Sequence, residues 1–234
     1  MDFSFENIQN QYQKAKDLGY SFMTCFEYSQ HSKIDLGLTI INRVDIDFSI
    51  KKAEKLLSIF NKLGIKATFF IRLHAPEYNP FSFENYLIIK KIIETGHEVG
   101  YHSEIIDQES IWNESPEFCL KRDLDVINNF FNIKVKGIAS HGGITGLNNL
   151  DFWKNASVKD YNVEYEAYEE IGKFSLFKNS FYISDSEWVR WKCYKNGAIC
   201  KHDNRTFGEH LNDKHTLIYL LVHPDTYYEK HPYE

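Results

Sequence analysis

The feature that most constrains the fold is an alternation of short apolar runs with longer stretches whose apolar residues recur at helical spacing. Leu38 to Val44 is an apolar run that ends in charged residues. Ile50 to Leu63 follows it with apolar side chains three or four positions apart, closed by Gly64. The first pattern predicts a strand and the second an amphipathic helix. Strands separated by helices pair in parallel through right-handed crossovers.

The same alternation continues along the chain. Further strands are predicted at Ala67 to Ile71, Glu98 to Tyr101, Val135 to Ala139, Phe181 to Ser184 and Thr216 to Val222. Helices are predicted at Phe83 to Thr95 and Glu117 to Phe131, and shorter helical stretches at Asn148 to Trp153 and Phe207 to Leu211. This order predicts an α/β fold, either a parallel (β/α) barrel or an open doubly wound sheet.

Length and composition favour one domain. The chain has 234 residues, which suits a single barrel, and no repeat or Pro/Gly-rich linker divides it. We therefore expect one domain over residues 1–234, with residues 1–35 as an N-terminal helical extension packed on it. Aromatic residues make up 16% of the chain, and this excess leans weakly toward a carbohydrate site, because sugars are often held by aromatic faces.

The net charge and the distribution of cysteines limit the classes of binding partner and the cellular location that we expect. The net charge of -6 and the lack of any Lys/Arg run argue against nucleic acid or a polybasic membrane patch. No run reaches the roughly 18 apolar residues of a membrane span. The four cysteines are dispersed and no signal peptide is visible, so reduced thiols and a cytoplasmic location are expected. The sequence leaves the oligomeric state open.

Carboxylates and histidines follow one predicted strand after another. In a parallel barrel the carboxyl ends of the strands share one face, where the active site is built, whereas an open sheet spreads them along an edge. The orderly placement therefore favours the barrel. The residues concerned are Asp45, Asp47, His102, His141, Asp185 and His223.

The first group of candidate ligands is RVDID at residues 43–47. Asp45 and Asp47 lie two positions apart and so face the same side of an extended chain. Two adjacent carboxylates repel, and a cation relieves that repulsion; if one binds a metal, the other is free as a base. The alternative is a solvated strand end with an aspartate that caps the helix beginning near Ile50.

The second group lies in residues 96–104, where His102 directly follows a predicted strand and Glu104 comes two residues later. Imidazole and carboxylate are normal ligands of zinc and similar divalent ions. His97 begins the same strand, which places it at the opposite rim, and we interpret it as structural.

These motifs together resemble the polysaccharide deacetylase family, especially divergent members associated with surface-polysaccharide gene sets. The resemblance runs from about Leu36 to Tyr227 and includes residues 43–47, ATFFI at 67–71, residues 96–104 and LVHP at 221–224. It implies a distorted barrel of about seven strands with one divalent metal, usually zinc. It also implies removal of acetyl groups from N-acetylated sugars.

The resemblance assigns roles to four positions. It makes Asp45 the base, Asp47 and His102 metal ligands, and His223 the general acid. Family members carry a second ligand histidine four residues after the first, where this chain has Ile106. The family's arginine-proline-aromatic segment, which supports the base, is not recognisable either.

A third metal ligand must therefore come from elsewhere. Glu104, Asp107 and His141 are the alternatives; we favour His141, with Glu104 next, because His141 ends the following strand beside two glycines. Asp185 is predicted to orient His223 or a sugar hydroxyl, although it is equally suited to a turn.

The remaining candidates for substrate binding or support are Arg43, Trp188 and Trp191; the two tryptophans could form a sugar platform or simply pack. The predicted function is a metal-dependent hydrolase that removes an acetyl group, or cleaves a related non-peptide carbon-nitrogen bond, in surface-polysaccharide metabolism. Its substrate is expected to be a carbohydrate or nucleotide-sugar. The alternative is a non-catalytic barrel that binds a sugar or nucleotide-sugar and has lost part of the metal site.

Overall fold

A mostly parallel sheet forms the centre of the computed structural model, which describes residues 2–31, 36–170, 172 and 174–230. Parallel ladders link its strands from β6 to β7, and antiparallel ladders add β8 and β9. β1 (Ser21–Met23) pairs in parallel with the first half of β2. In spatial order the other strands are β6 (Tyr165–Glu166), β5 (Gly137–Ser140), β4 (Glu98–Ser103), β3 (Thr68–Ile71), β2 (Thr39–Ile46), β10 (Leu217–Val222), β7 (Phe181–Ser184), β8 (Lys192–Lys195) and β9 (Ala198–Ile199).

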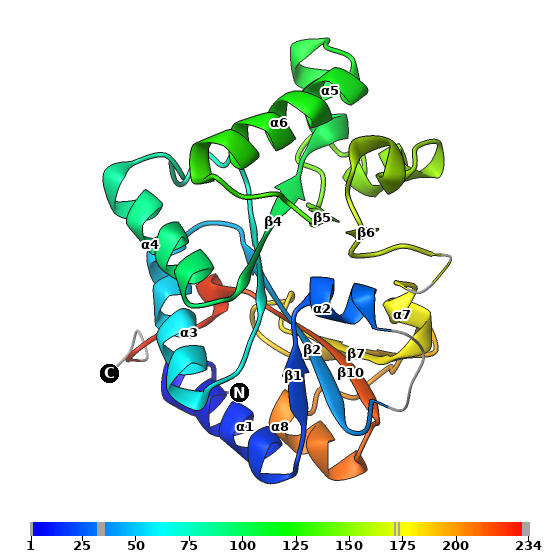
Figure 1. Ribbon diagram of the computed structural model, residues 1–234. Helices are drawn as coiled ribbons and strands as arrows, with labels where there is room; N and C mark the ends of the chain where they lie inside the picture. The colour runs from blue at the N-terminus through cyan, green and yellow to red at the C-terminus, as the bar shows by residue number, and fades with distance from the viewer. Residues whose placement is uncertain (1, 32–35, 171, 173, 231–234) are drawn as a thin grey trace.

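Most of the helices cover the outer face of this sheet, whereas α2 and α7 pack on its inner face. In Figure 1, α1, α3 and α4 lie in succession along one side, while α5 packs on α6 beyond β4. None of the described helices is long and apolar enough to cross a membrane. The helices are α1 (Phe5–Asp17), α2 (Cys25–Gln30), α3 (Ile50–Leu63), α4 (Phe83–Glu94), α5 (Ile105–Trp112), α6 (Pro116–Phe131), α7 (Leu176–Asn179) and α8 (Phe207–His210), with 3-10 turns η1 (Asn149–Lys154), η2 (Val158–Tyr161), η3 (Leu211–Asp213) and η4 (Pro224–Thr226).

Helix α3 shows how local sequence sets an element. The Ser49 hydroxyl accepts a hydrogen bond from the Lys52 amide, which caps the first turn, and Gly64 ends the helix with a φ of 64°. Its apolar side chains lie on one face and are buried against the sheet, as the helical spacing predicts. The predicted bounds of this helix are confirmed.

The two faces of the sheet bury separate apolar clusters. The outer cluster lies under the helices, and the inner cluster includes Phe70, Tyr165 and Tyr219. The Tyr219 hydroxyl donates to the Ala167 carbonyl at 3.2 Å, and the Tyr165 ring stacks on Phe174 with centroids 4.3 Å apart. These contacts join β10 to the region of β6, so the sheet curls around the inner cluster. Every residue of β2 is buried because both faces are covered.

The α/β class and the parallel pairing agree with the sequence prediction, but two details differ. The sheet has ten strands rather than about seven, and among the described residues no backbone ladder joins its two ends. The N-terminal segment also contributes β1 to the sheet, so residues 21–23 are not part of a purely helical extension. Very short strands carry too few residues to show a period-two pattern, which explains why sequence reasoning missed them.

Candidate metal and catalytic site

Five of the predicted site residues meet at one rim of the sheet. Asp45 lies in β2 and Asp47 just after it, while His102 lies in β4 and His141 and His223 directly follow β5 and β10. Because these strands are parallel, their carboxyl ends lie at the same edge.

Three of these side chains form a cluster with the donor chemistry of a divalent metal site. One carboxylate oxygen of Asp47 and one ring nitrogen each of His102 and His141 lie within 4.8 Å of one another. His102 Nε2 is 3.3 Å and His141 Nε2 is 4.0 Å from Asp47 Oδ1. This oxygen is buried, and it has no hydrogen-bond partner among the described residues. An unpaired buried carboxylate oxygen facing two imidazoles fits a cation such as zinc.

The backbone and a buried ion pair orient the two imidazoles. His102 Nδ1 lies 2.8 Å from the Ala139 carbonyl, so Nδ1 carries the proton and Nε2 offers its lone pair. His141 Nδ1 lies 3.5 Å from Glu104 Oε1, which accepts hydrogen bonds from Arg72 Nε and Nη2. Glu104 therefore sits behind His141, paired with Arg72. Of the two predicted third ligands, the geometry favours His141.

The position that the family gives to a ligand histidine serves packing instead. Ile106 is the second residue of α5 and packs against the outer core. The neighbouring Asp107 accepts hydrogen bonds from the Ile144 and Thr145 amides and from Asn149 Nδ2. Asn149 Nδ2 also donates to the His141 carbonyl at 3.1 Å. Asp107 thus braces the loop that begins at His141, and its oxygens are used for that purpose.

Asp45 is held by a buried arginine from its own strand. Arg43 Nε and Nη2 donate to the two carboxylate oxygens of Asp45 at 2.8 and 2.7 Å, and the guanidinium lies 4.3 Å from the ring centre of Tyr168. Burial alone would raise the pKa of Asp45, but the charge and hydrogen bonds of Arg43, together with the nearby His102 and His223, outweigh burial, so the pKa of Asp45 is lowered. Asp45 Oδ2 also lies 3.4 Å from His102 Nε2. Asp45 is therefore an ionised, oriented carboxylate beside the three donors.

His223 pairs with the carboxylate that was predicted to orient it. His223 Nδ1 lies 2.6 Å from Asp185 Oδ1, and Asp185 also accepts from the His223 backbone amide. Burial lowers the pKa of His223, but the charge and hydrogen bond of Asp185, together with the charges of Asp47 and Asp45, outweigh burial and raise that pKa to about 9. His223 Nε2 lies 3.9 Å from Asp47 Oδ2. At neutral pH this imidazolium faces the same point as Asp45 and the three donors.

The two tryptophans that were predicted as a sugar platform lie in different environments. Trp188 is 40% exposed, and its ring lies nearly parallel to that of His223, with centroids 6.4 Å apart. Trp191 is 1% exposed and stacks on Phe3 in the outer core. The prediction that Trp191 contacts substrate is wrong, because the chain reversal into β8 turns this ring toward the N-terminal segment. Trp188 stands at a φ of 64°, a strained value for a large side chain.

Sequence reasoning overlooked Arg72, which directly follows β3. Besides its bonds to Glu104, Arg72 Nη1 donates to the Asp47 carbonyl at 2.9 Å. A charged residue immediately after the apolar run at 67–71 was the available signal.

His97, interpreted as structural, lies at the opposite end of β4, where Nδ1 accepts from the Ala67 amide. That interpretation is confirmed.

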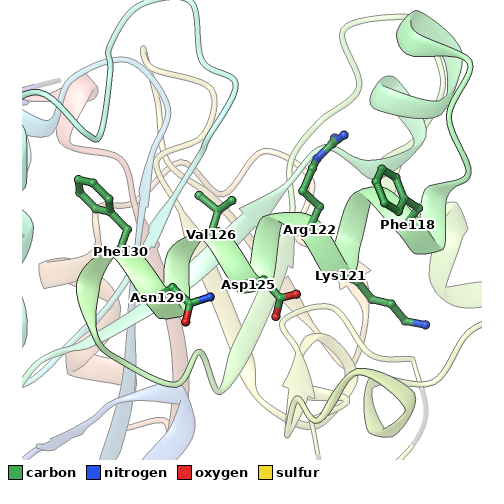
Figure 2. Close-up of a pocket in the computed structure, with 7 residues that line it drawn as sticks. All are labelled: Phe118, Lys121, Arg122, Asp125, Val126, Asn129 and Phe130. Atoms are coloured by element: carbon green, nitrogen blue, oxygen red, sulfur yellow. The ribbon is translucent and has the colours of Figure 1, made fainter.

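A hollow on the outer surface of α6 contains no residue of this site. It is lined by Phe118, Arg122, Val126 and Phe130 on one helical stripe, with Lys121, Asp125 and Asn129 beside them (Figure 2). These side chains point away from the sheet, and among them only the exposed Asp125 offers a metal-binding group. The chemistry collects at the strand ends.

Comparisons with known proteins give distant structural neighbours. No model of a known protein family and no curated protein matches the chain. The structure is similar to BA3943, a CE4 family pseudoenzyme from Bacillus anthracis, and to a mutant of BA3943 with restored enzymatic activity. Identity is 17% over 82% of this chain in both cases, covering 56% and 58% of those chains, with a TM-score of 0.47.

It is also similar to Streptococcus pyogenes deacetylase PplD in complex with acetate, at 20% identity over 59% of this chain and 62% of that chain, with a TM-score of 0.45. The chain spans less than two thirds of the length of each neighbour.

Proposed function

We propose that this chain is a metal-dependent hydrolase that removes an acetyl group from an N-acetylated sugar, built on the distorted barrel of the polysaccharide deacetylase family. One observation carries the proposal. Asp47, His102 and His141 bring three donor atoms within 4.8 Å of one another beside an oriented carboxylate and a buried imidazole that is paired with a carboxylate. Deacetylation needs a metal, a base and an acid at one place, and this rim offers groups for all three.

Asp47, His102 and His141 would hold the metal, and the donor set fits zinc. When bound, such an ion polarises the acetyl carbonyl and lowers the pKa of a coordinated water from about 15.7 toward 7. Three protein ligands leave a position open for water and substrate, as in catalytic zinc sites.

Asp45 and His223 would move the protons. Asp45 is ionised because of Arg43, and so it can take a proton from the attacking water. His223 is protonated at neutral pH, and Asp185 fixes its Nδ1 proton, which leaves the Nε2 proton for the departing amine. Base and acid thus start in the protonation states that the reaction requires.

The sugar would enter along the exposed Trp188 ring. This ring lies over His223 and contacts Phe48, with centroids 5.2 Å apart. An aromatic face beside the acid can pack against the apolar side of a pyranose while its acetamido group reaches the metal. The substrate we propose is a carbohydrate or nucleotide-sugar of surface-polysaccharide metabolism, used in the cytoplasm.

Acetate release from N-acetylated oligosaccharides tests the proposal. Wild-type protein loaded with zinc should release acetate, and Asp47→Asn and His223→Gln should each lose at least about 100-fold, the scale expected for an acid-base group or a metal ligand. Exposed His202 supplies the control, since His202→Asn should keep full activity. Equal rates in wild type and both site variants would contradict the mechanism.

Metal content separates the alternative function from this one. A non-catalytic sugar-binding protein has a specific point in its favour, because Ile106 stands where the family carries a ligand. If purified protein binds sugar but holds no zinc through Asp47 and releases no acetate, the alternative holds. His141→Ala should abolish zinc binding at this rim, whereas Glu104→Gln should only weaken it, because Glu104 acts through His141.

A further inference from the structure

A second group of metal-binding side chains lies on the outer side of the sheet, away from the rim described above. It combines the β8–β9 hairpin, the loop after it and α8. One donor atom each from Cys193, Asp203 and His210 lies within 4.8 Å of the others. His210 packs on Phe181 at the beginning of β7, whereas His223 follows the end of β10. The two groups therefore lie toward opposite ends of the parallel strands.

The hairpin also brings a second thiol, that of Cys200, opposite Cys193. Tyr194 pairs with Ile199 and Lys195 with Ala198, so Cys193 and Cys200 are the next residues to face each other. The Cys200 amide donates to the Cys193 carbonyl at 2.9 Å. Residues directly opposite in an antiparallel pair project from the same face. Both cysteines are free thiols. The two-residue turn at 196–197 creates this pairing. It was not predicted from the sequence, in which the two cysteines are separated.

The surroundings of the buried His210 side chain favour a bound cation. This side chain is 1% exposed, and neither ring nitrogen makes a hydrogen bond among the described residues. Asp203 Oδ1 lies 3.5 Å from Nε2, and Asp213 Oδ2 lies 3.6 Å from Nδ1. Buried polar atoms without partners are costly and need an explanation. A cation bound at Nε2 would satisfy one nitrogen, and Asp213 would then accept from the other, as carboxylates commonly do behind metal-bound histidines.

The charge balance at this place also suits a cation. Arg205 Nη2 lies 2.8 Å from Asp203 Oδ2, and Arg205 Nη1 lies 3.1 Å from Asp213 Oδ2. A carboxylate has about four lone-pair positions, so Asp203 can serve both Arg205 and a metal.

We propose that Cys193, Cys200, Asp203 and His210 bind a zinc ion at a structural site separate from the candidate active site. Two thiolates with an imidazole and a carboxylate favour zinc over oxygen-seeking ions such as magnesium. Four protein ligands close the coordination sphere, which is the arrangement of structural zinc. The ion fastens the β8–β9 hairpin and the loop at 200–206 to α8.

Cobalt substitution tests this site independently of the active site. A Co²⁺ ion bound to thiolate gives an intense near-ultraviolet charge-transfer band, and the candidate active site contains no cysteine. Titration of reduced, metal-free protein with Co²⁺ should produce this band, saturating at about one equivalent. The band should persist in Asp47→Asn and in the buried-cysteine control Cys119→Ala; it should weaken in Cys193→Ser and in Cys200→Ser, each of which keeps one thiolate, and disappear when both cysteines are replaced by serine. His210→Gln keeps both thiols and should weaken Co²⁺ binding about tenfold or more.

Absence of the band in wild-type protein would overturn the proposal, as would an undiminished band in both Cys193→Ser and Cys200→Ser. Should those variants fail to fold, Asp47→Asn loaded with zinc provides the second measurement. Blocking its thiols with a mercurial should release about one equivalent of zinc. Release of none would overturn the proposal. Loss of acetate release with the band intact would instead count against the proposed function alone.

Discussion

Protonation of His97 should destabilise the fold, and the size of the effect follows from its contacts. The side chain is 6% exposed; Nδ1 accepts from the Ala67 amide at 3.2 Å, and Nε2 lies 3.1 Å from Asn61 Oδ1. A proton on Nδ1 would face the Ala67 N–H, so the folded chain holds the neutral ring. Burial, with the nearby Lys66 charge, lowers the pKa of His97 to about 4.

The difference between the pKa values of His97 in the folded and unfolded chains sets the sign of the effect on stability and its pH range. In the unfolded chain His97 takes up a proton near pH 6.5, whereas the folded chain resists protonation down to about 4. The stabilisation is therefore complete above pH 6.5 and is lost progressively as the pH falls toward 4. Between pH 7 and pH 5 the two pKa values give a loss of about 2 kcal/mol.

Urea unfolding at the two pH values measures this loss. Other buried histidines also contribute, His141 and His210 in the same direction and His223 in the opposite one. The test is therefore the difference between proteins: the free energy of unfolding should fall about 2 kcal/mol less in His97→Gln than in wild type. Exposed His202 provides the control, and His202→Asn should behave as wild type. An identical pH dependence in wild type and His97→Gln would refute the reasoning.

Three further predictions concern the candidate site. Arg43→Met leaves the buried Asp45 carboxylate without its partner and should cost about 3 to 5 kcal/mol in urea unfolding; a loss below about 1 kcal/mol would contradict the tight buried pairing. Asp185→Asn removes the charge that raises the pKa of His223, so NMR titration of this ring should show the pKa falling from about 9; an unchanged value would show that Asp185 is not the cause. Asp107→Ala releases the loop after β5 and should weaken zinc binding at the rim about 10- to 100-fold by calorimetry, whereas unchanged affinity would mean that the loop needs no brace.

The main helices and strands, and the edge of the sheet at which the candidate site lies, follow from local sequence patterns. Helix α3 and strand β7 have the predicted bounds, because local propensity, caps and periodicity agree there. Asp45 and Asp47 share a face because the side-chain period of a strand is two. Histidines that follow parallel strands meet at one edge because parallel strands all end at the same edge of the sheet.

Only the tertiary structure decided which of the candidates meet. His141 rather than Glu104 faces Asp47 because Arg72, from another strand, engages Glu104. Trp191 is buried because Phe3, far away in the sequence, packs on it.

The cysteines are a further example. They are dispersed in the sequence, but a two-residue turn places Cys193 opposite Cys200. Periodicity reports how a segment lies relative to the core. Contacts between distant segments depend on sheet curvature, loop paths and the packing of neighbouring strands, and no local pattern encodes these.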